Sequence, residues 1–176
     1  MRSSGYHADD SGITAEEISF VRGTAEGKQV REDVVGIVGV PMPAVVEWLR
    51  RRYPAAAVHA ALVIGSLQAK ARKKFGGEEM VWALPEALEQ ATDFVVAGHK
   101  ARRFAEAFAR RCSSESPLIV DACAGIGGET LALAEVAPVV AVDLSAARVA
   151  CLEANLQRRR AHYPSRAIAG AVGVEC

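Results

Sequence analysis

The chain has 176 residues, which suits one compact domain and is too short for two large ones. Hydrophobic residues make up 51% of it, and 21 acidic side chains balance 21 basic ones, which excludes a disordered polyelectrolyte and a histone-like basic protein. Prolines and polar residues interrupt the apolar stretches at 34–49 and 55–67, so neither reaches the length of about 18 residues that a membrane helix needs. The polar N-terminus has no apolar secretory segment, and we therefore expect a cytoplasmic protein with no membrane span.

The first 110 residues are predicted to be mostly helical. Thr14 and Glu17 have the spacing of a capping box that opens a short helix. Pro43 suits the first turn of a helix running through Trp48, and Pro54 suits that of an alanine-rich helix reaching about Phe75, where the pair Gly76-Gly77 stops it.

A further helix is predicted from Thr92 to Cys112. Apolar residues recur there at spacings of three and four, which predicts one buried face: Phe94, Val95, Ala97, Ala101, Phe104, Ala105 and Phe108. His99, on the same helix, is interpreted as a surface or capping histidine. Trp82, just before this region, is interpreted as a core residue.

The zero net charge hides a basic middle segment. Residues 50–111 contain 12 basic and 6 acidic side chains, whereas acids outnumber bases on both sides of this segment. One interpretation is that helices in residues 50–111 bind an RNA phosphate backbone; the other is that these are solvated helix faces.

After residue 117 short apolar runs alternate with helical segments. Residues 118–123 and 138–144 are predicted strands, residues 127–136 and 145–159 are predicted helices, and one more short strand is expected near 167–169. Ser145 is the predicted N-cap of the second helix. Strand, turn, helix, strand is a βαβ unit with a parallel sheet. The predicted fold class is therefore α/β, with a helical region at 1–112 followed by a partial Rossmann-like sheet at 117–176.

The turn between the first predicted strand and helix carries the functional signal. Gly125 and Gly127 allow backbone conformations or close approaches that a Cβ would hinder. Asp143, at the end of the second strand, is placed to accept hydrogen bonds from the hydroxyls of a ribose. The pattern favours a nucleoside-cofactor site; the alternative is a tight turn followed by a surface cap. Thr130 stands where a dinucleotide fingerprint has Gly or Ala, which disfavours an NAD-dependent oxidoreductase, and Asp121 favours S-adenosylmethionine, whose ammonium group needs a carboxylate.

Two segments resemble a known family. DACAGIGGET at 121–130 and VVAVDLSAARVACLEAN at 139–155 look like motif I and the following acidic motif of class I S-adenosylmethionine-dependent methyltransferases. The most similar branch contains the trimethylguanosine synthases, which methylate N2 of an RNA cap guanine, and bacterial relatives with a THUMP-like domain. LEQAT at 88–92 and HKA-x-RF at 99–104 are similar to the helical region of those relatives, so the resemblance covers about residues 50–157.

The resemblance implies a set of cofactor-binding residues. The methionine part of S-adenosylmethionine would be held by Asp121, Ala124, Gly125 and Gly127. Asp143 would bind the ribose, and Leu144 would lie against the adenine. The function expected from the family is methyl transfer from this cofactor to N2 of guanine in RNA.

The chain also departs from the family. Leu84 stands where the family has a threonine that lies against the cofactor. None of the seven prolines is followed by another proline, so the family's catalytic Pro-Pro-aromatic step has no counterpart and no catalytic residue is assigned. Only 33 residues follow Asp143, which predicts a C-terminally truncated copy of the methyltransferase sheet. The alternative is a non-catalytic RNA- or protein-binding module, and an incomplete sheet predicts self-association through its exposed edge.

The four cysteines have no metal-site pattern. Cys112, Cys123, Cys151 and Cys176 are widely spaced, with no C-x-x-C pair. We expect reduced thiols, no disulfide and no metal. Cys123 is predicted to be a small buried residue at the end of a strand.

Overall fold

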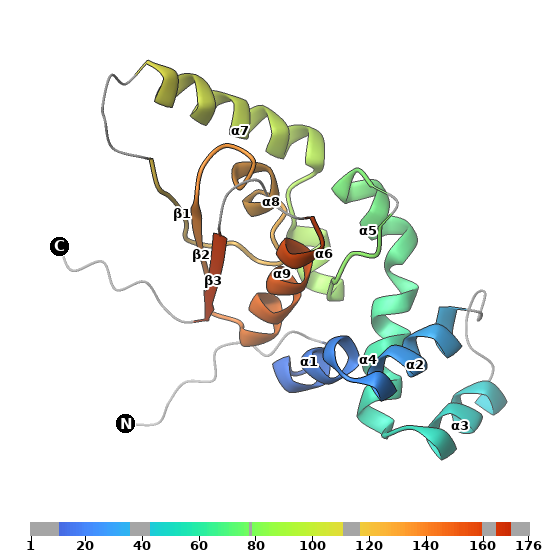
Figure 1. Cartoon of the computed structure of the whole chain (residues 1–176). Coiled ribbons are helices and arrows are strands. Elements are labelled where there is room, and N and C mark those ends of the chain that lie inside the picture. Colours follow the sequence, from blue (N-terminus) through green and yellow to red (C-terminus); the bar gives the residue numbers. More distant parts are fainter. Residues whose placement is uncertain (1–10, 36–42, 78, 111–116, 160–164, 170–176) are drawn as a thin grey trace, which may run out of the picture.

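A computed structural model describes residues 11–35, 43–77, 79–110, 117–159 and 165–169. Its described part is mostly helical, with one small parallel sheet (Figure 1). Helices α1 to α7 precede the sheet in the chain, and α8 and α9 are interleaved with its strands. The predicted α/β class is thus confirmed.

Two of the first three helices, α1 and α3, begin where the sequence predicts, and α2 was not predicted. Helix α1 (Ala15–Gly23) has the predicted capping box: Thr14 Oγ1 accepts from Glu17 N at 3.2 Å, and Glu17 Oε2 accepts from Thr14 N at 2.8 Å. Helix α2 (Ala25–Val35) follows after a single residue, and α3 (Pro43–Arg52) starts at the predicted proline.

The helix predicted from Pro54 to Phe75 is two helices. Helix α4 (Ala55–Ser66) and α5 (Gln68–Phe75) are separated at Leu67. The Gln68 side chain explains the break, because its Nε2 donates to Ile64 O and Val81 O while its Oε1 accepts from Val81 N. The first bond joins α5 to the last turn of α4, and the two bonds with Val81 tie α5 to the segment after it. Gly76 then ends α5 in the left-handed conformation, as predicted.

Helix α6 (Pro85–Gln90) was not predicted as a separate element, and α7 (Phe94–Ala109) buries less than its sequence predicts. Of the expected apolar face, only Ala97 and Ala101 are buried, whereas Phe94, Val95 and Phe104 are exposed. Helix α7 contacts α8, and the two side chains that it buries are both small. Residues 111–112 of the prediction lie outside the described part.

The sheet has three parallel strands in the order β1-β2-β3. Strand β1 (Ile119–Asp121) and β2 (Val139–Asp143) are shorter than predicted, and β3 (Ser165–Ala169) begins two residues before the expected strand. The register places Ile119 beside Val139 and Asp143 beside Ala169. Helix α9 (Ala146–Arg159) follows the predicted N-cap, since Ser145 Oγ accepts from Arg148 N at 3.3 Å.

The helix predicted at 127–136 is much shorter in the structure. Helix α8 (Thr130–Leu133) has only four residues. The backbone N–H groups of Glu135 and Val136 donate three residues back, to Ala132 O and Leu133 O, so the last turn tightens and ends.

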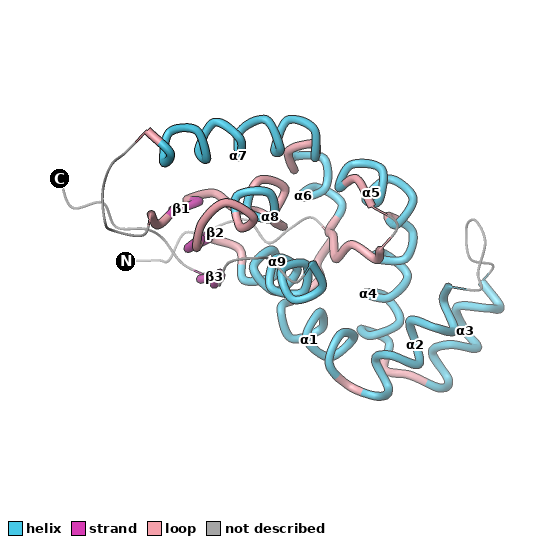
Figure 2. The backbone as a smooth tube through the Cα atoms, turned by 45° about the horizontal axis from the view of Figure 1, so that its top comes forward, coloured by secondary structure: helices cyan, strands magenta, loops and turns pink. Residues whose placement is uncertain are grey.

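The helical region and the sheet share one hydrophobic core, which runs from Ile18 through Leu88 to Leu152. Figure 2 shows α8 and α9 on one side of the sheet, and within the described residues no helix covers the other side. Val120 and Ile168 remain 58% and 39% exposed there. Among the described helices, none combines the length and apolar character that crossing a membrane requires.

Candidate functional site

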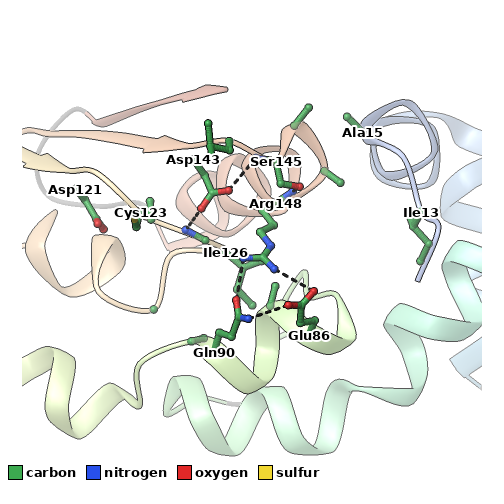
Figure 3. A pocket seen from close by; sticks show the side chains of 18 of the residues that line it. Ile13, Ala15, Glu86, Gln90, Asp121, Cys123, Ile126, Asp143, Ser145 and Arg148 are labelled. Carbon is green, nitrogen blue, oxygen red and sulfur yellow. Dashed lines mark hydrogen bonds and ion pairs between the residues drawn. The ribbon is translucent and has the colours of Figure 1, made fainter. Parts of the chain in front are cut away.

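A cavity of about 920 Å³ lies at the carboxyl ends of β1 and β2 (Figure 3), within the size range of small-molecule sites, about 300–1,000 Å³. Five of the six predicted cofactor-binding residues line it: Asp121, Ala124, Gly125, Asp143 and Leu144. They come from two strand ends and the loop between β1 and α8, which the parallel register places side by side.

The glycines of this loop have three different roles. Gly125 has φ +54° and open space where a Cβ would point, so a ligand can approach its backbone. Gly127, the sixth predicted residue, does not line the cavity; its φ is +96°, and a Cβ there would lie 2.5 Å from Leu152 Cδ1. Its role is to let the loop pack on α9. Gly128 is equally tight, because a Cβ would lie 2.7 Å from the backbone N of Thr92.

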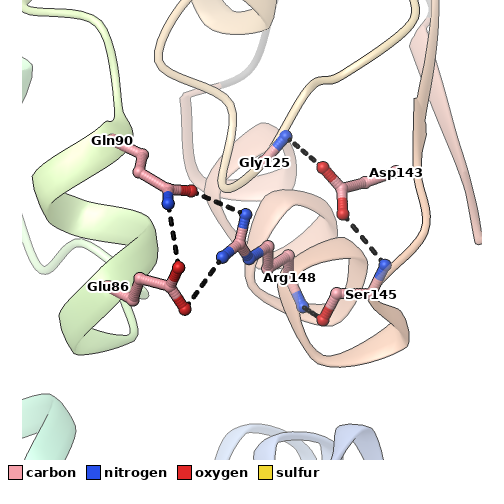
Figure 4. A network of polar contacts seen from close by, with 6 residues as sticks. All are labelled: Glu86, Gln90, Gly125, Asp143, Ser145 and Arg148. Atoms are coloured by element: carbon pink, nitrogen blue, oxygen red, sulfur yellow. Dashed lines mark hydrogen bonds and ion pairs between the residues drawn. The ribbon is translucent and has the colours of Figure 1, made fainter. Parts of the chain in front are cut away.

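Asp143 is held by two backbone donors (Figure 4). Its Oδ2 accepts from Gly125 N and its Oδ1 from Ser145 N, both at 2.9 Å. A carboxylate offers about four acceptor positions, so two remain for further donors. The carboxylate is therefore fixed in orientation and can still accept bonds from a pair of hydroxyl groups.

Asp121 is the second carboxylate at a strand end. Its Oδ2 accepts from Thr130 Oγ1 at 2.6 Å, and it also accepts from the backbone N–H of Cys123. Burial raises the pKa of Asp121, and the nearby Glu129 carboxylate acts in the same direction. A cationic group bound in the cavity would stabilise the ionised form of this side chain.

The cavity is acidic. Among its described lining residues, one base, Arg148, faces five carboxylates: Glu16, Glu86, Asp121, Glu129 and Asp143. Arg148 is engaged in the wall, with Nη1 2.9 Å from Gln90 Oε1 and Nη2 3.4 Å from Glu86 Oε2 (Figure 4). Glu129 pairs with Lys100, which together with the Thr92 hydroxyl lowers its pKa against the effect of burial.

The far wall was not predicted. It consists of Gly12–Glu16 at the start of α1 together with Glu86, Gln90 and Thr92 around α6. The sequence analysis singled out residues 88–92 for their resemblance to the methyltransferase relatives but did not place them in a cavity wall, and nothing in residues 12–16 indicates a wall. Leu84, at the family's threonine position, is fully buried and does not line the cavity.

Other candidate residues are placed as follows. Cys123 is exposed in the loop and lines the cavity, so its predicted burial is wrong; β1 ends at Asp121, two residues earlier. Cys151 is buried and is not disulfide-bonded, and Cys112 and Cys176 lie outside the described residues. Trp82 is buried as predicted, and His99 is exposed on α7, away from the cavity.

Comparisons of the chain with protein-family models, with curated proteins and with solved structures found no match. The functional conclusion therefore rests on the geometry and chemistry of the cavity.

Proposed function

We propose that the chain binds S-adenosylmethionine in this cavity and belongs to the methyl-transferring enzymes of the Rossmann-like class. One observation carries the proposal: two oriented carboxylates at adjacent strand ends flank a glycine loop with open space beside Gly125. The strand order β1-β2-β3 supports it, because it corresponds to one half of a doubly wound sheet, where ligands bind at the carboxyl ends.

The charge of the cavity supports this cofactor over NAD. S-adenosylmethionine has a net positive charge, whereas NAD carries a negatively charged pyrophosphate. Two of the five lining carboxylates, Glu86 and Glu129, are paired with Arg148 and Lys100. The other three, Glu16, Asp121 and Asp143, take no part in the described ion pairs, and they attract the former ligand and repel the latter.

The residues present fit the cofactor. Asp143 would bind the ribose hydroxyls, Asp121 the ammonium group, and the backbone at Ala124 and Gly125 would lie along the methionine part. Leu144, 60% exposed beside them, would cover the adenine. The bound cofactor would supply a sulfonium methyl group for in-line displacement, and the chain's part is to orient it and exclude water.

We further propose RNA guanine N2 as the methyl acceptor. The basic segment supports an RNA partner only in part, because Arg51, Lys70 and Lys100 pair with acids of the chain and Lys74 donates to carbonyls. Arg72 and Lys73 on α5, and Arg103 on α7, are exposed and take no part in the described ion pairs. These side chains, like Arg50 and Arg110, are available to phosphates, and RNA binding through them weakens with salt.

A second candidate is a non-catalytic RNA- or protein-binding module. It is favoured by the missing Pro-Pro-aromatic step, since the cavity offers described groups for the cofactor but no assigned group for orienting an acceptor base.

Transfer of a labelled methyl group separates the two candidates. The chain is incubated with methyl-labelled S-adenosylmethionine and a guanosine-containing RNA, and a matched RNA has inosine, which lacks the N2 amino group, in place of guanosine. We expect label on N2-methylguanosine only in the first RNA. Cofactor binding without transfer to any RNA supports the non-catalytic module, and no cofactor binding by the folded chain refutes both cofactor and reaction.

A further inference from the structure

Thr130 is one of the two buried polar side chains in the described chain and lies directly behind the cavity. It is the first residue of α8, is fully buried, and donates its hydroxyl to Asp121 Oδ2 at 2.6 Å. Its backbone belongs to the helix, since Thr130 O accepts from the N–H of Ala134, the C-cap residue of α8. A hydroxyl buried to this extent and bonded to a carboxylate that lines a cavity indicates a role beyond packing.

We propose that Thr130 is a specificity-determining residue that fixes the Asp121 carboxylate, in its ionised form, as the acceptor for the primary ammonium group of a ligand with an amino acid part. The proposal rests on the proposed function, because it concerns the same cavity. It assigns to Thr130 an action through Asp121 and no contact with the ligand.

The hydrogen bonds of Asp121 account for the selectivity. The Thr130 hydroxyl and the Cys123 N–H occupy two of the carboxylate's acceptor positions, which leaves the others for a donor from the cavity. A hydroxyl donating to a carboxylate makes a strong, charge-assisted bond, so the side chain keeps one orientation. A ligand that lacks the ammonium group leaves this carboxylate buried and without its partner.

The groups around Asp121 determine how the loss of the Thr130 hydroxyl changes the pKa of Asp121 and the pH dependence of ligand binding. Burial and Glu129 raise its pKa, while Thr130, the Cys123 N–H and Lys100 lower it. Loss of the Thr130 hydroxyl removes one stabilising contact of the charged form, so the pKa of Asp121 rises further. Protons then compete with a cationic ligand at a higher pH than in the unaltered chain.

Two ligands and three variants test the proposal. S-adenosylhomocysteine has the amino acid part, and 5′-methylthioadenosine has the same nucleoside without it. Thr130→Val keeps the shape but loses the donor, Thr130→Ser keeps the donor, and Thr130→Ala serves as a second hydroxyl-free variant should the valine not be accommodated. Calorimetry at pH 7.5 should show S-adenosylhomocysteine weakened about tenfold by Thr130→Val or Thr130→Ala, unchanged within about twofold by Thr130→Ser, and 5′-methylthioadenosine unaffected by all three.

A purely structural role gives a different result. If both ligands weaken equally in the hydroxyl-free variants, or if S-adenosylhomocysteine does not weaken, the proposal is wrong. In the Asp121→Asn background the effect of Thr130→Val should disappear, because the carboxylate through which it acts is gone.

The pKa of Asp121, measured from its carboxyl carbon resonance in the ligand-free chain, distinguishes this proposal from the proposed function. It should be higher in Thr130→Val than in the unaltered chain, and an unchanged value refutes the role of Thr130. If neither ligand binds the unaltered chain, the proposed function fails, and the role as a ligand-specificity residue fails with it whatever the pKa shows.

Discussion

At the scale of single residues, the alkylation rate of Cys123 measures whether a ligand occupies the cavity that this residue lines. Its thiol is exposed in the loop between Asp121 and Gly125, whereas Cys151, a residue of α9, is buried. We predict that iodoacetamide alkylates Cys123 faster than Cys151 and that S-adenosylhomocysteine slows the alkylation of Cys123 alone. Peptide mass mapping with time measures both rates in one sample.

Two other alkylation patterns would contradict this prediction. Alkylation of Cys123 at the same rate with and without a saturating nucleoside ligand means that the ligand does not occupy the loop side of the cavity. Slower alkylation of Cys123 and Cys151 together indicates general stabilisation of the fold.

The residues that local sequence could identify are those with local causes. Asp121, Gly125 and Asp143 follow from a strand, a turn and a second strand, and all three line the cavity. The burial of Cys123 was misjudged because β1 ends earlier than predicted. Gly127 has the close approach that its pattern predicted, but the neighbour is a distant residue of α9. The 2.5 Å approach of Leu152 to the Cβ position of Gly127 has no signal in the loop's own sequence.

At the scale of elements, Asn155 joins α9 to two other segments. Its side chain accepts from Trp82 N at 2.8 Å and donates to Trp82 O and Ile126 O at 3.0 and 2.9 Å. Asn155→Ala leaves three buried backbone groups without partners, so we predict a loss of about 2–4 kcal/mol in the free energy of unfolding. Urea unfolding measures it, with Gln157→Ala, an exposed position on the same helix, as the control. A loss no greater than that of the control refutes this role of Asn155.

Gly128 and Gly98 differ in the space around their Cβ positions. A Cβ at Gly128 would meet the Thr92 backbone at 2.7 and 2.9 Å, and backbone atoms cannot turn aside. Gly98, within α7, has open space around its Cβ position. We predict that Gly128→Ala lowers the midpoint of thermal unfolding by an amount equivalent to about 1–3 kcal/mol, whereas Gly98→Ala raises it through helix propensity by up to about 1 kcal/mol. Equal effects of the two substitutions would show that the Thr92 backbone and the glycine loop do not meet as described.

Sequence pattern located most elements but misjudged those whose extent depends on tertiary contacts. Capping at Thr14 and Ser145 is local and was predicted. The break at Leu67 depends on bonds from Gln68 to Val81, thirteen residues away. The exposed aromatic face of α7 depends on which helix packs against Ala97 and Ala101.

At the scale of the whole molecule, the open face of the sheet predicts self-association. Parallel sheets are normally covered on both faces, and Val120 on the outer described strand β1 is 58% exposed. We predict that the apparent mass by light scattering rises with protein concentration and that Val120→Lys suppresses the rise. Val95→Lys makes the same change at a valine of α7 that is 63% exposed and should leave the rise intact.

Two observations would contradict this prediction. A constant monomer mass over the whole concentration range excludes self-association. Equal suppression by Val95→Lys and Val120→Lys assigns the association to general surface charge and not to β1.

The walls of the cavity come from segments that lie far apart in the chain. The sequence predicted its sheet-side wall, but the opposite wall comes from the start of α1 and from α6, both separated from β1 by the whole of α7. The balance of charge in the chain is even, yet the lining is acidic, because folding gathers Glu16, Glu86 and three later carboxylates around one arginine. Such gathering depends on tertiary structure and cannot be read from charge runs.

Calorimetric titration with S-adenosylhomocysteine tests the central claim most directly. The chain is titrated beside Asp143→Asn, and beside Glu153→Gln as a control acid on α9 outside the cavity, with NAD as the competing ligand. We predict one site, a dissociation constant about ten- to a hundredfold weaker in Asp143→Asn, unchanged affinity in Glu153→Gln and no heat with NAD. Absence of binding in a chain that unfolds cooperatively, or equal affinity of the unaltered chain and Asp143→Asn, would contradict the assignment of this cavity to S-adenosylmethionine.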